Sequence, residues 1–295
     1  MECCLRRTNH AQTSLPSSHS SHLTRKSFMN FFCDVLPNVP AMAGAPIIED
    51  VRLMFPDLPE TEALEHWVLG GSSDSLLGRK GVSNMTLAGA QPTYFPNYAE
   101  TALGARNGLL TGFADADQQA FAMVMHFTDS GENGGRILIG SGTASSGPGS
   151  RLDGFVLSQS TGNAASPNQL QCQYRLGTNF SPFPAAVIEA LIGKWIFIGM
   201  ATDMATKVQS FYIHGVGHVA RAPDSATWGK ATVAVAIGNG YYAPSSGQAS
   251  RYDRGIEVAE AMVLGKVPTP AMWSEIAQRA VMRSALRGLS VYAGE

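Results

Sequence analysis

Cysteine is scarce in this chain: it occurs four times in 295 residues, and three of the four lie within the first 33 positions. No pair has the C-x-x-C spacing of a zinc site, and the set does not form a disulfide framework. Long apolar runs are absent too, because no stretch reaches the roughly 18 residues that a membrane-spanning helix needs. Charge near the N-terminus is not followed by an apolar stretch, so we expect no secretory signal.

Charge is the other scarce property. Lysine, arginine, aspartate and glutamate make up 15% of the chain, whereas an average soluble domain has about 25%. The formal net charge is −2. So small an excess creates no overall field that attracts nucleic acid or an anionic membrane, and we expect neither as a partner. The low charge indicates a surface that is either inert or partly buried in an assembly.

What the chain has in quantity is turn residues between short apolar segments. It contains 31 glycines and 16 prolines, and several segments alternate apolar and polar side chains with the period of two that is typical of β-strands. Many short strands separated by turns predict an all-β sandwich, and the missing strand–helix–strand rhythm argues against a nucleotide-binding α/β fold. The expected strands are 120–127, 136–140, 154–158, 170–176, 195–200, 208–214, 232–237 and 256–264.

Residues 1–45 differ from the rest of the chain. They are rich in serine, histidine and threonine and lack apolar periodicity, a composition typical of a disordered or extended arm. One interpretation is an assembly arm that docks on a neighbouring subunit. The other is a floppy tail, or an extension upstream of a later start at Met29 or Met42. The residues that we assign to the assembly arm are Arg6, Arg7, Arg25, Lys26, Phe28, Phe31 and Phe32.

Three segments follow the arm. Residues 46–80 are interpreted as a short helical or irregular linker, in which 58–69 is expected to be an amphipathic helix or a loop. Residues 81–268 form the sandwich. Residues 269–295 form a short helix that packs on the sandwich or on a partner, with Thr269 as N-cap and Pro270 in the first turn. Its apolar stripe begins at Trp273, and the helix dipole favours the arginines near its C-terminus, which are Arg279, Arg283 and Arg287.

Several short motifs resemble, in their order and spacing, the strands of laminin-G-like domains. The motifs GKWIFI at 193–198 and FYIHG at 211–215 resemble the paired central strands, and GIEVAEAMVL at 255–264 resembles the closing strand. The resemblance covers about residues 65–280 and implies a concanavalin A-like fold: a two-sheet antiparallel jelly-roll sandwich with an extended N-terminal arm and a short C-terminal helix. The members of this kind that the chain resembles occur in bacteriophage tail fibres and other virion proteins.

Known catalytic motifs are absent from the sequence. A strand carrying E-x-D-x-x-E, which would place carboxylates on one face for glycoside hydrolysis, does not occur. Glu257 and Glu260 are three residues apart on an expected strand and should therefore point to opposite faces. No G-x-S-x-G, P-loop or dinucleotide motif is present, and Cys172 is expected to be a small core residue. We therefore predict no catalytic residues and no enzymatic activity.

Calcium is the only cofactor that the sequence leaves open. Asp115 and Asp117 share one face if their segment is extended, and the resemblance implies calcium because some laminin-G-like domains use it. The alternative is that both aspartates lie in a solvated turn. No other metal and no other cofactor is indicated.

Sugar binding is the small-molecule activity that the sequence favours. It needs an exposed aromatic face together with polar groups, because sugar C–H faces stack while sugar hydroxyls need hydrogen-bond partners. The long segment 238–255 supplies both, and a loop of this length inside a compact domain is often functional. The alternative is that its tyrosines cover the core or a subunit contact. The glycan-binding candidates are Asn239, Tyr241, Tyr242, Arg251, Tyr252 and Asp253.

These observations favour a structural or adhesive virion component, namely a phage tail-fibre, baseplate or capsid-associated protein. We expect it in the virion, assembled in the host cytoplasm, as a homo-oligomer that binds other virion subunits and a host-surface glycan. Two alternatives remain. One is a stand-alone carbohydrate-binding lectin domain, and the other is a polysaccharide hydrolase with an unrecognised site.

Overall fold

The computed structural model of the chain describes most of the sequence from residue 59 onward. The assembly arm lies outside the described residues, so its role stays a prediction. The described residues are 59–104, 106–129, 135–142, 154–160, 168–173, 181–221, 229–241 and 254–294.

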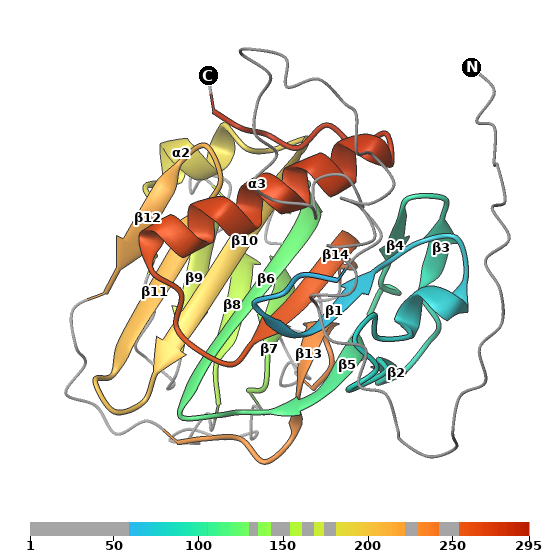
Figure 1. Ribbon diagram of the computed structural model, residues 1–295, viewed down its shortest axis with the longest axis horizontal. Helices are drawn as coiled ribbons and strands as arrows, with labels where there is room; N and C mark the ends of the chain where they lie inside the picture. Colours follow the sequence, from blue (N-terminus) through green and yellow to red (C-terminus); the bar gives the residue numbers. More distant parts are fainter. Residues whose placement is uncertain are drawn as a thin grey trace, which may run out of the picture. The chain divides into compact units, whose positions relative to one another are not determined.

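Two antiparallel sheets face each other and form the body of the described protein (Figure 1). The larger sheet has the order β12-β11-β10-β6-β14-β4-β3, and β1 pairs with the edge of β14 that β4 also uses. Its strands are β1 (Ala63–Val68), β3 (Thr93–Phe95), β4 (Tyr98–Glu100), β6 (Gln118–Phe127), β10 (Lys194–Asp203), β11 (Val208–Ile213), β12 (Gly217–Ala220) and β14 (Glu257–Leu264).

The smaller sheet has the order β2-β5-β13-β7-β8-β9. Together the two sheets confirm the predicted all-β antiparallel sandwich. Two short helical segments, η2 (Ser73–Leu76) and α2 (Ala185–Glu189), join strands, and the helix α3 (Pro270–Leu286) follows β14. The strands of the smaller sheet are β2 (Thr86–Leu87), β5 (Asn107–Ala114), β7 (Gly135–Gly140), β8 (Val156–Ser160), β9 (Gln169–Gln173) and β13 (Ala234–Asn239).

Strand β6 shows why the larger sheet is apolar on both faces. Phe121, Met123 and Met125 belong to the core between the two sheets. Ala122 and Val124, which alternate with them, belong to a second core that includes the buried side chains of α3. A strand that is covered on both sides keeps apolar residues at every position, so its sequence resembles a continuous run more than an alternation.

Helix α3 lies across the outer face of the larger sheet (Figure 1). Thr269 caps it as predicted, because its side chain accepts a hydrogen bond from the N–H of Met272 at 3.2 Å. Trp273 is fully buried against the sheet, where Gly199 of β10 leaves room for the indole. A Cβ atom at Gly199 would lie 2.5 Å from that ring, so the helix can approach the sheet closely only because this position is glycine.

The helix expected within 58–69 is wrong, because Ala63–Val68 form strand β1. Trp67 enters the core between the sheets, whereas the neighbouring His66 reaches Glu260 of β14, 3.1 Å away. Pairing with the edge of β14 gives these residues a period of two. The local pattern of apolar residues was too short to distinguish the two structures, and tertiary pairing decides between them.

The three arginines of α3 lie on the face of the helix that meets the sheet. We call Arg279, Arg283 and Arg287 the arginine row. Arg279 binds the carboxylate of Glu60 at 2.8 Å, and Arg283 binds Glu260 at 2.6 Å, with all four side chains almost completely buried. The row therefore does more than complement a helix dipole, since it forms buried ion pairs that join α3 to the sheet.

Arg287 binds backbone carbonyls at the junction where the partner of β14 changes from β4 to β1. Strand β14 pairs with β4 at Glu257 and Val258 and with β1 from Glu260 onward. At the junction, the Arg287 guanidinium donates hydrogen bonds to three backbone carbonyls, those of Leu69, Asn97 and Ala259. Carbonyls that are partly withdrawn from water need such partners, so this arginine completes the sheet where its edge strand changes.

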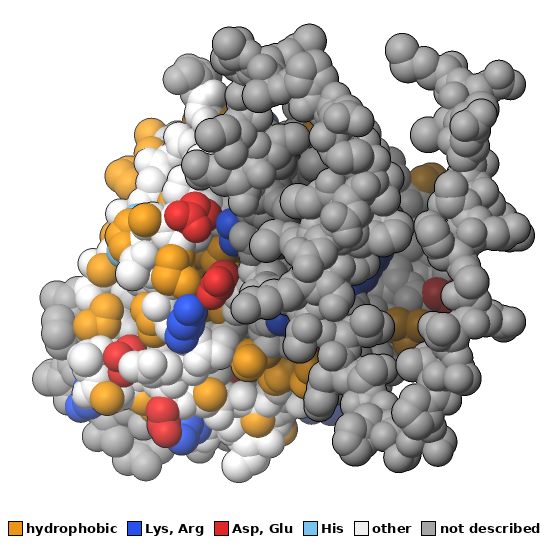
Figure 2. Space-filling model, viewed as in Figure 1, with side chains coloured by type: hydrophobic (Ala, Val, Ile, Leu, Met, Phe, Trp, Pro, Cys, Tyr) orange, Lys and Arg blue, Asp and Glu red, His pale blue; other side chains and the backbone are white. Residues whose placement is uncertain are grey.

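Acidic and basic side chains alternate on the face that Figure 2 shows, and neither sign gathers into a continuous patch. This mixture agrees with the net charge of −2. Among the described residues, no helix combines the length and the apolar character that a membrane crossing requires.

Candidate functional site

Two of the six predicted glycan-binding residues are described. Asn239 is buried at the end of β13, and Tyr241 is half-buried, with its hydroxyl donating a hydrogen bond to the carbonyl of Ala234 at 2.7 Å. Burial raises the pKa of Tyr241. Tyr241 is therefore held against the strand, and Asn239 is withdrawn from solvent. The other four candidates lie outside the described residues, and their role stays a prediction: Tyr242, Arg251, Tyr252 and Asp253.

Asp115 and Asp117 do not form a site that fits calcium. Asp115 accepts hydrogen bonds from the N–H of Ala231 at 3.0 Å and from Gln119, and Asp117 pairs with Lys230 at 2.8 Å. Burial raises the pKa of Asp115, although its hydrogen bonds and Lys230 oppose that rise. Calcium prefers about six to eight oxygen ligands, and within the described part of the chain no group of three or more acidic, histidine or cysteine side chains is arranged to hold a metal ion.

Aromatic side chains from four strands meet on the α3 side of the larger sheet. We call Phe95, Tyr98, Trp195 and His126 the aromatic shelf. Phe95 stacks on Tyr98 with 4.4 Å between ring centroids, and Tyr98 meets the edge of Trp195 at 5.2 Å. Trp195 in turn stacks on His126 at 5.2 Å. All four side chains are partly exposed, so the shelf presents aromatic surface to solvent.

Two carboxylates border the aromatic shelf. Glu257 lies 3.0 Å from Nδ1 of His126, and its side chain is about a quarter exposed. Glu100 is the direct cross-strand partner of Glu257, so both project from the same face of the sheet. Burial raises the pKa of Tyr98, and the negative charges of Glu257 and Glu100 raise it further.

The expectation that Glu257 and Glu260 point to opposite faces is wrong. The pairing of β14 with β6 shifts by one residue between Val258 and Glu260, which is the mark of a β-bulge. The extra residue returns Glu260 to the α3 side, where it binds Arg283, while Glu257 meets His126 on the same side. A bulge moves every later residue of the strand to the opposite face. The number of residues between Glu257 and Glu260 does not show that a bulge lies between them.

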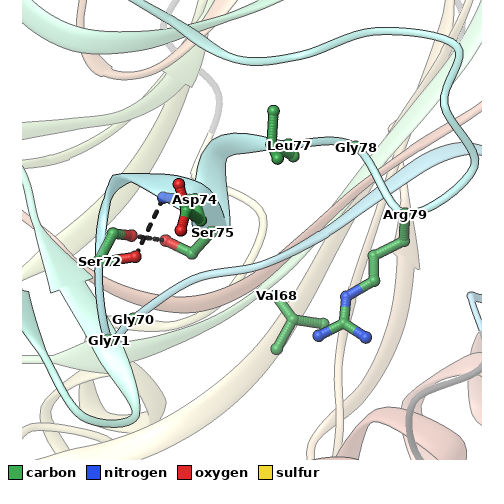
Figure 3. Close-up of a pocket in the computed structure, with 9 residues that line it drawn as sticks. All are labelled: Val68, Gly70, Gly71, Ser72, Asp74, Ser75, Leu77, Gly78 and Arg79. Atoms are coloured by element: carbon green, nitrogen blue, oxygen red, sulfur yellow. Dashed lines mark hydrogen bonds between the residues drawn. The ribbon is translucent and has the colours of Figure 1, made fainter.

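A pocket of about 450 Å³ opens beside η2, where β1 ends (Figure 3). In Figure 3 the side chains of Ser72, Asp74 and Ser75 lie together at one end and Arg79 lies at the other, near Val68. Gly70, Gly71 and Gly78 supply bare backbone between them, and Leu77 adds an apolar side chain. We call this cavity the Gly70–Arg79 pocket.

Glu65 holds the loop that forms one wall of this pocket. Its carboxylate accepts hydrogen bonds from the N–H groups of His66, Lys80, Val82 and Ser83, at distances of 2.7 to 2.9 Å. Burial opposes ionisation of Glu65, but these four donors outweigh it and hold its pKa below the ordinary value. The charged carboxylate therefore fixes the loop after Gly78 in one conformation.

Neither the shelf nor the pocket was predicted from the sequence. The shelf draws its side chains from β3, β4, β6 and β10, which lie up to 100 positions apart, so no local motif connects them. The signal that could have found them is the strand register, because only the pairing of β6 with β10 places His126 opposite Trp195. The pocket depends on a glycine-rich loop that was interpreted as part of a linker.

No family model matches the chain, and no curated protein matches it either. Solved structures do. A Trypanosoma rangeli sialidase in complex with sialic acid has a TM-score of 0.53 and 11% identity, covering 76% of this chain and 34% of that one. A mutant of Trypanosoma rangeli sialidase displaying trans-sialidase activity has a TM-score of 0.51 and 14% identity, covering 84% and 36%. A mutant of HCR/D has a TM-score of 0.50 and 10% identity, covering 77% and 52%.

These likenesses show the fold, a β-sandwich consistent with the concanavalin A-like class. The chain spans about a third of the length of the sialidases, which have 34–36% of their length covered. The sequence-based expectation that the chain is not an enzyme is overturned by this comparison, because its fold occurs within chains that are sialidases. Identities of 11–14% assign no reaction to this chain.

Proposed function

We propose that this chain is a glycan-binding β-sandwich module of an adhesive protein, and that the aromatic shelf is its binding surface. The observation that carries the proposal is the contact between aromatic rings and carboxylates at Tyr98, Trp195, His126 and Glu257. Sugar C–H faces pack on aromatic rings, and sugar hydroxyls donate to carboxylates. The sandwich fold that the chain shares with the sialidases supports the same class of ligand.

Within the shelf, each group has a distinct task. The exposed parts of Trp195 and Tyr98 offer apolar area for the face of a sugar ring. Glu257 and Glu100 accept hydrogen bonds from hydroxyls at the ring's rim. His126 holds Glu257 in place through its Nδ1 contact at 3.0 Å, so the carboxylate needs little ordering when a sugar binds.

The test is a glycan array read with the purified full chain, followed by titration calorimetry on the glycan that binds. We expect Trp195→Ala and Glu257→Gln each to weaken binding roughly tenfold or more, because a sugar–aromatic contact and a hydrogen bond to a charged group each contribute about 1–3 kcal/mol. His126→Gln should weaken it less, and His218→Gln on the far edge strand β12 is the matched control. An array with no signal for the wild-type chain would contradict the proposal.

A second candidate function is glycoside hydrolysis at the same surface. Glu100 and Glu257 are direct cross-strand partners, so their side chains project next to each other from one face of the sheet. Retaining glycosidases hold their two carboxyl groups about 5–5.5 Å apart, one protonating the leaving oxygen and the other attacking the sugar. Release of reducing ends by the wild-type chain, abolished in both Glu100→Gln and Glu257→Gln even at polysaccharide concentrations that saturate binding, would favour this function over binding alone.

We also propose the setting in which the module works: a virion, as a tail-fibre, baseplate or capsid-associated component assembled in the host cytoplasm. The strand motifs, the low charge of 15% and the basic and aromatic arm residues support this proposal. Other virion subunits, further copies of the chain and a host-surface glycan would be its partners.

A further inference from the structure

The Gly70–Arg79 pocket and the aromatic shelf share one structural part, the turn between β3 and β4. Gly70 packs so closely on this turn that an added Cβ atom would lie 2.5 Å from the backbone nitrogen of Tyr98. The N–H of Gly71 donates to the carbonyl of Phe95 at 2.7 Å. Phe95 and Tyr98 are themselves half of the shelf, so the floor of the pocket and the shelf form one rigid unit.

Both features face the α3 side of the larger sheet. Tyr98 and Trp195 pack against the core beneath α3. Arg287 at the end of α3 reaches the carbonyl of Asn97 within the same turn. Val68, which lines the pocket, is the direct cross-strand partner of Glu260, whose carboxylate binds Arg283 of α3, so Val68 projects to the α3 side as well. The pocket therefore lies beyond the turn but on the same side of the sheet as the shelf.

The polar groups of the pocket include both hydrogen-bond acceptors and hydrogen-bond donors. Asp74 offers a carboxylate that has no hydrogen-bond or ionic partner among the described residues. Ser72 already accepts the N–H of Asp74, which leaves its hydroxyl proton to donate, while Ser75 donates to the carbonyl of Ser72 and keeps its lone pairs. Arg79 adds a guanidinium, whose five N–H donors serve several partners at once.

We infer that the Gly70–Arg79 pocket is a second subsite, which takes a neutral sugar residue with neighbouring free hydroxyls from the glycan held by the aromatic shelf. A hydroxyl both donates and accepts, so neighbouring hydroxyls match the donor and acceptor groups of Asp74, Ser72 and Ser75. The charges of Asp74 and Arg79 offset each other, which favours a neutral residue. The volume of about 450 Å³ lies within the range of small-ligand sites. This inference rests on the proposed function of the shelf.

The test compares glycans of different length. The probe is the neutral array glycan that the wild-type chain binds, used at full length and shortened one residue at a time to the monosaccharide. Asp74→Asn should weaken binding of the full-length glycan roughly tenfold, because a charged acceptor with two oxygens becomes a neutral amide with one. It should leave the monosaccharide's affinity for the shelf unchanged, whereas Trp195→Ala should weaken both.

Asp117→Asn is the matched control, because it makes the same change at an exposed aspartate on another loop. Melting temperatures of both variants equal to that of the wild type exclude a folding defect, since Asp74 is exposed and its backbone cap to Ser72 persists. If Asp74→Asn binds the full-length glycan as tightly as the wild type does, the second subsite is wrong, whereas the proposed function of the shelf is unaffected. Binding restricted to acidic glycans overturns it as well, and a wild-type chain that binds no glycan overturns the function of the shelf itself.

Discussion

Glu260 shows how one residue can couple stability to pH. It is completely buried, and burial raises its pKa, but Arg283 and His66 outweigh that effect and hold the pKa at about 2. Because the folded value lies below the ordinary one of 4.5, the ionised form stabilises the fold at neutral pH. That stabilisation is complete above about pH 4.5 and is lost as the pH falls toward 2.

The prediction is that Glu260→Gln removes this part of the acid sensitivity. The variant leaves Arg283 buried without its main partner, which should lower the free energy of unfolding by roughly 3–5 kcal/mol at pH 7. Its urea-unfolding free energy should then change less between pH 4.5 and pH 2.5 than that of the wild type. The control is Glu62→Gln, whose partner Lys266 is exposed and whose loss should cost less than about 1 kcal/mol. Equal effects of the two substitutions would contradict this account.

At the scale of the element, helix α3 depends on one glycine of the strand beneath it. Gly199→Ala should push Trp273 away from β10 and lower the free energy of unfolding by roughly 1–3 kcal/mol, the usual cost of overpacking. Trp273→Leu also destabilises, by opening a cavity, but it makes room for the new methyl group. In urea unfolding the double variant should therefore lose less than the sum of the single variants. Additive losses would show that the indole does not contact position 199.

The sequence predicts some elements of this protein and not others, for physical reasons. Strand β10 and helix α3 are predictable because their apolar period, Thr269 cap and Pro270 are local properties. Strand β1 is not, because its six residues take their structure from the edge of β14. The shelf escapes prediction for the same reason, since the contact of His126 with Trp195 and Glu257 exists only once β6, β10 and β14 are paired.

At the scale of the whole molecule, the described body has three layers: α3, the larger sheet and the smaller sheet. Two cores lie between them, and the arginine row with Glu60 and Glu260 fixes the outermost layer. Glu60, near the start of the described residues, is buried in this network and belongs to the same rigid body as α3.

Assembly through the arm gives a prediction for the full chain. Native mass spectrometry at micromolar concentration should detect a homo-oligomer. Replacing Phe28, Phe31 and Phe32 by serine should convert it to a monomer, because apolar side chains in the buried centre of an interface supply most of its affinity. Replacing the four basic residues Arg6, Arg7, Arg25 and Lys26 should weaken it mainly at low salt, where exposed charges act over longer distances. A wild-type chain that stays monomeric, with the same oligomeric state as the phenylalanine variant, would show that these 45 residues do not drive self-assembly.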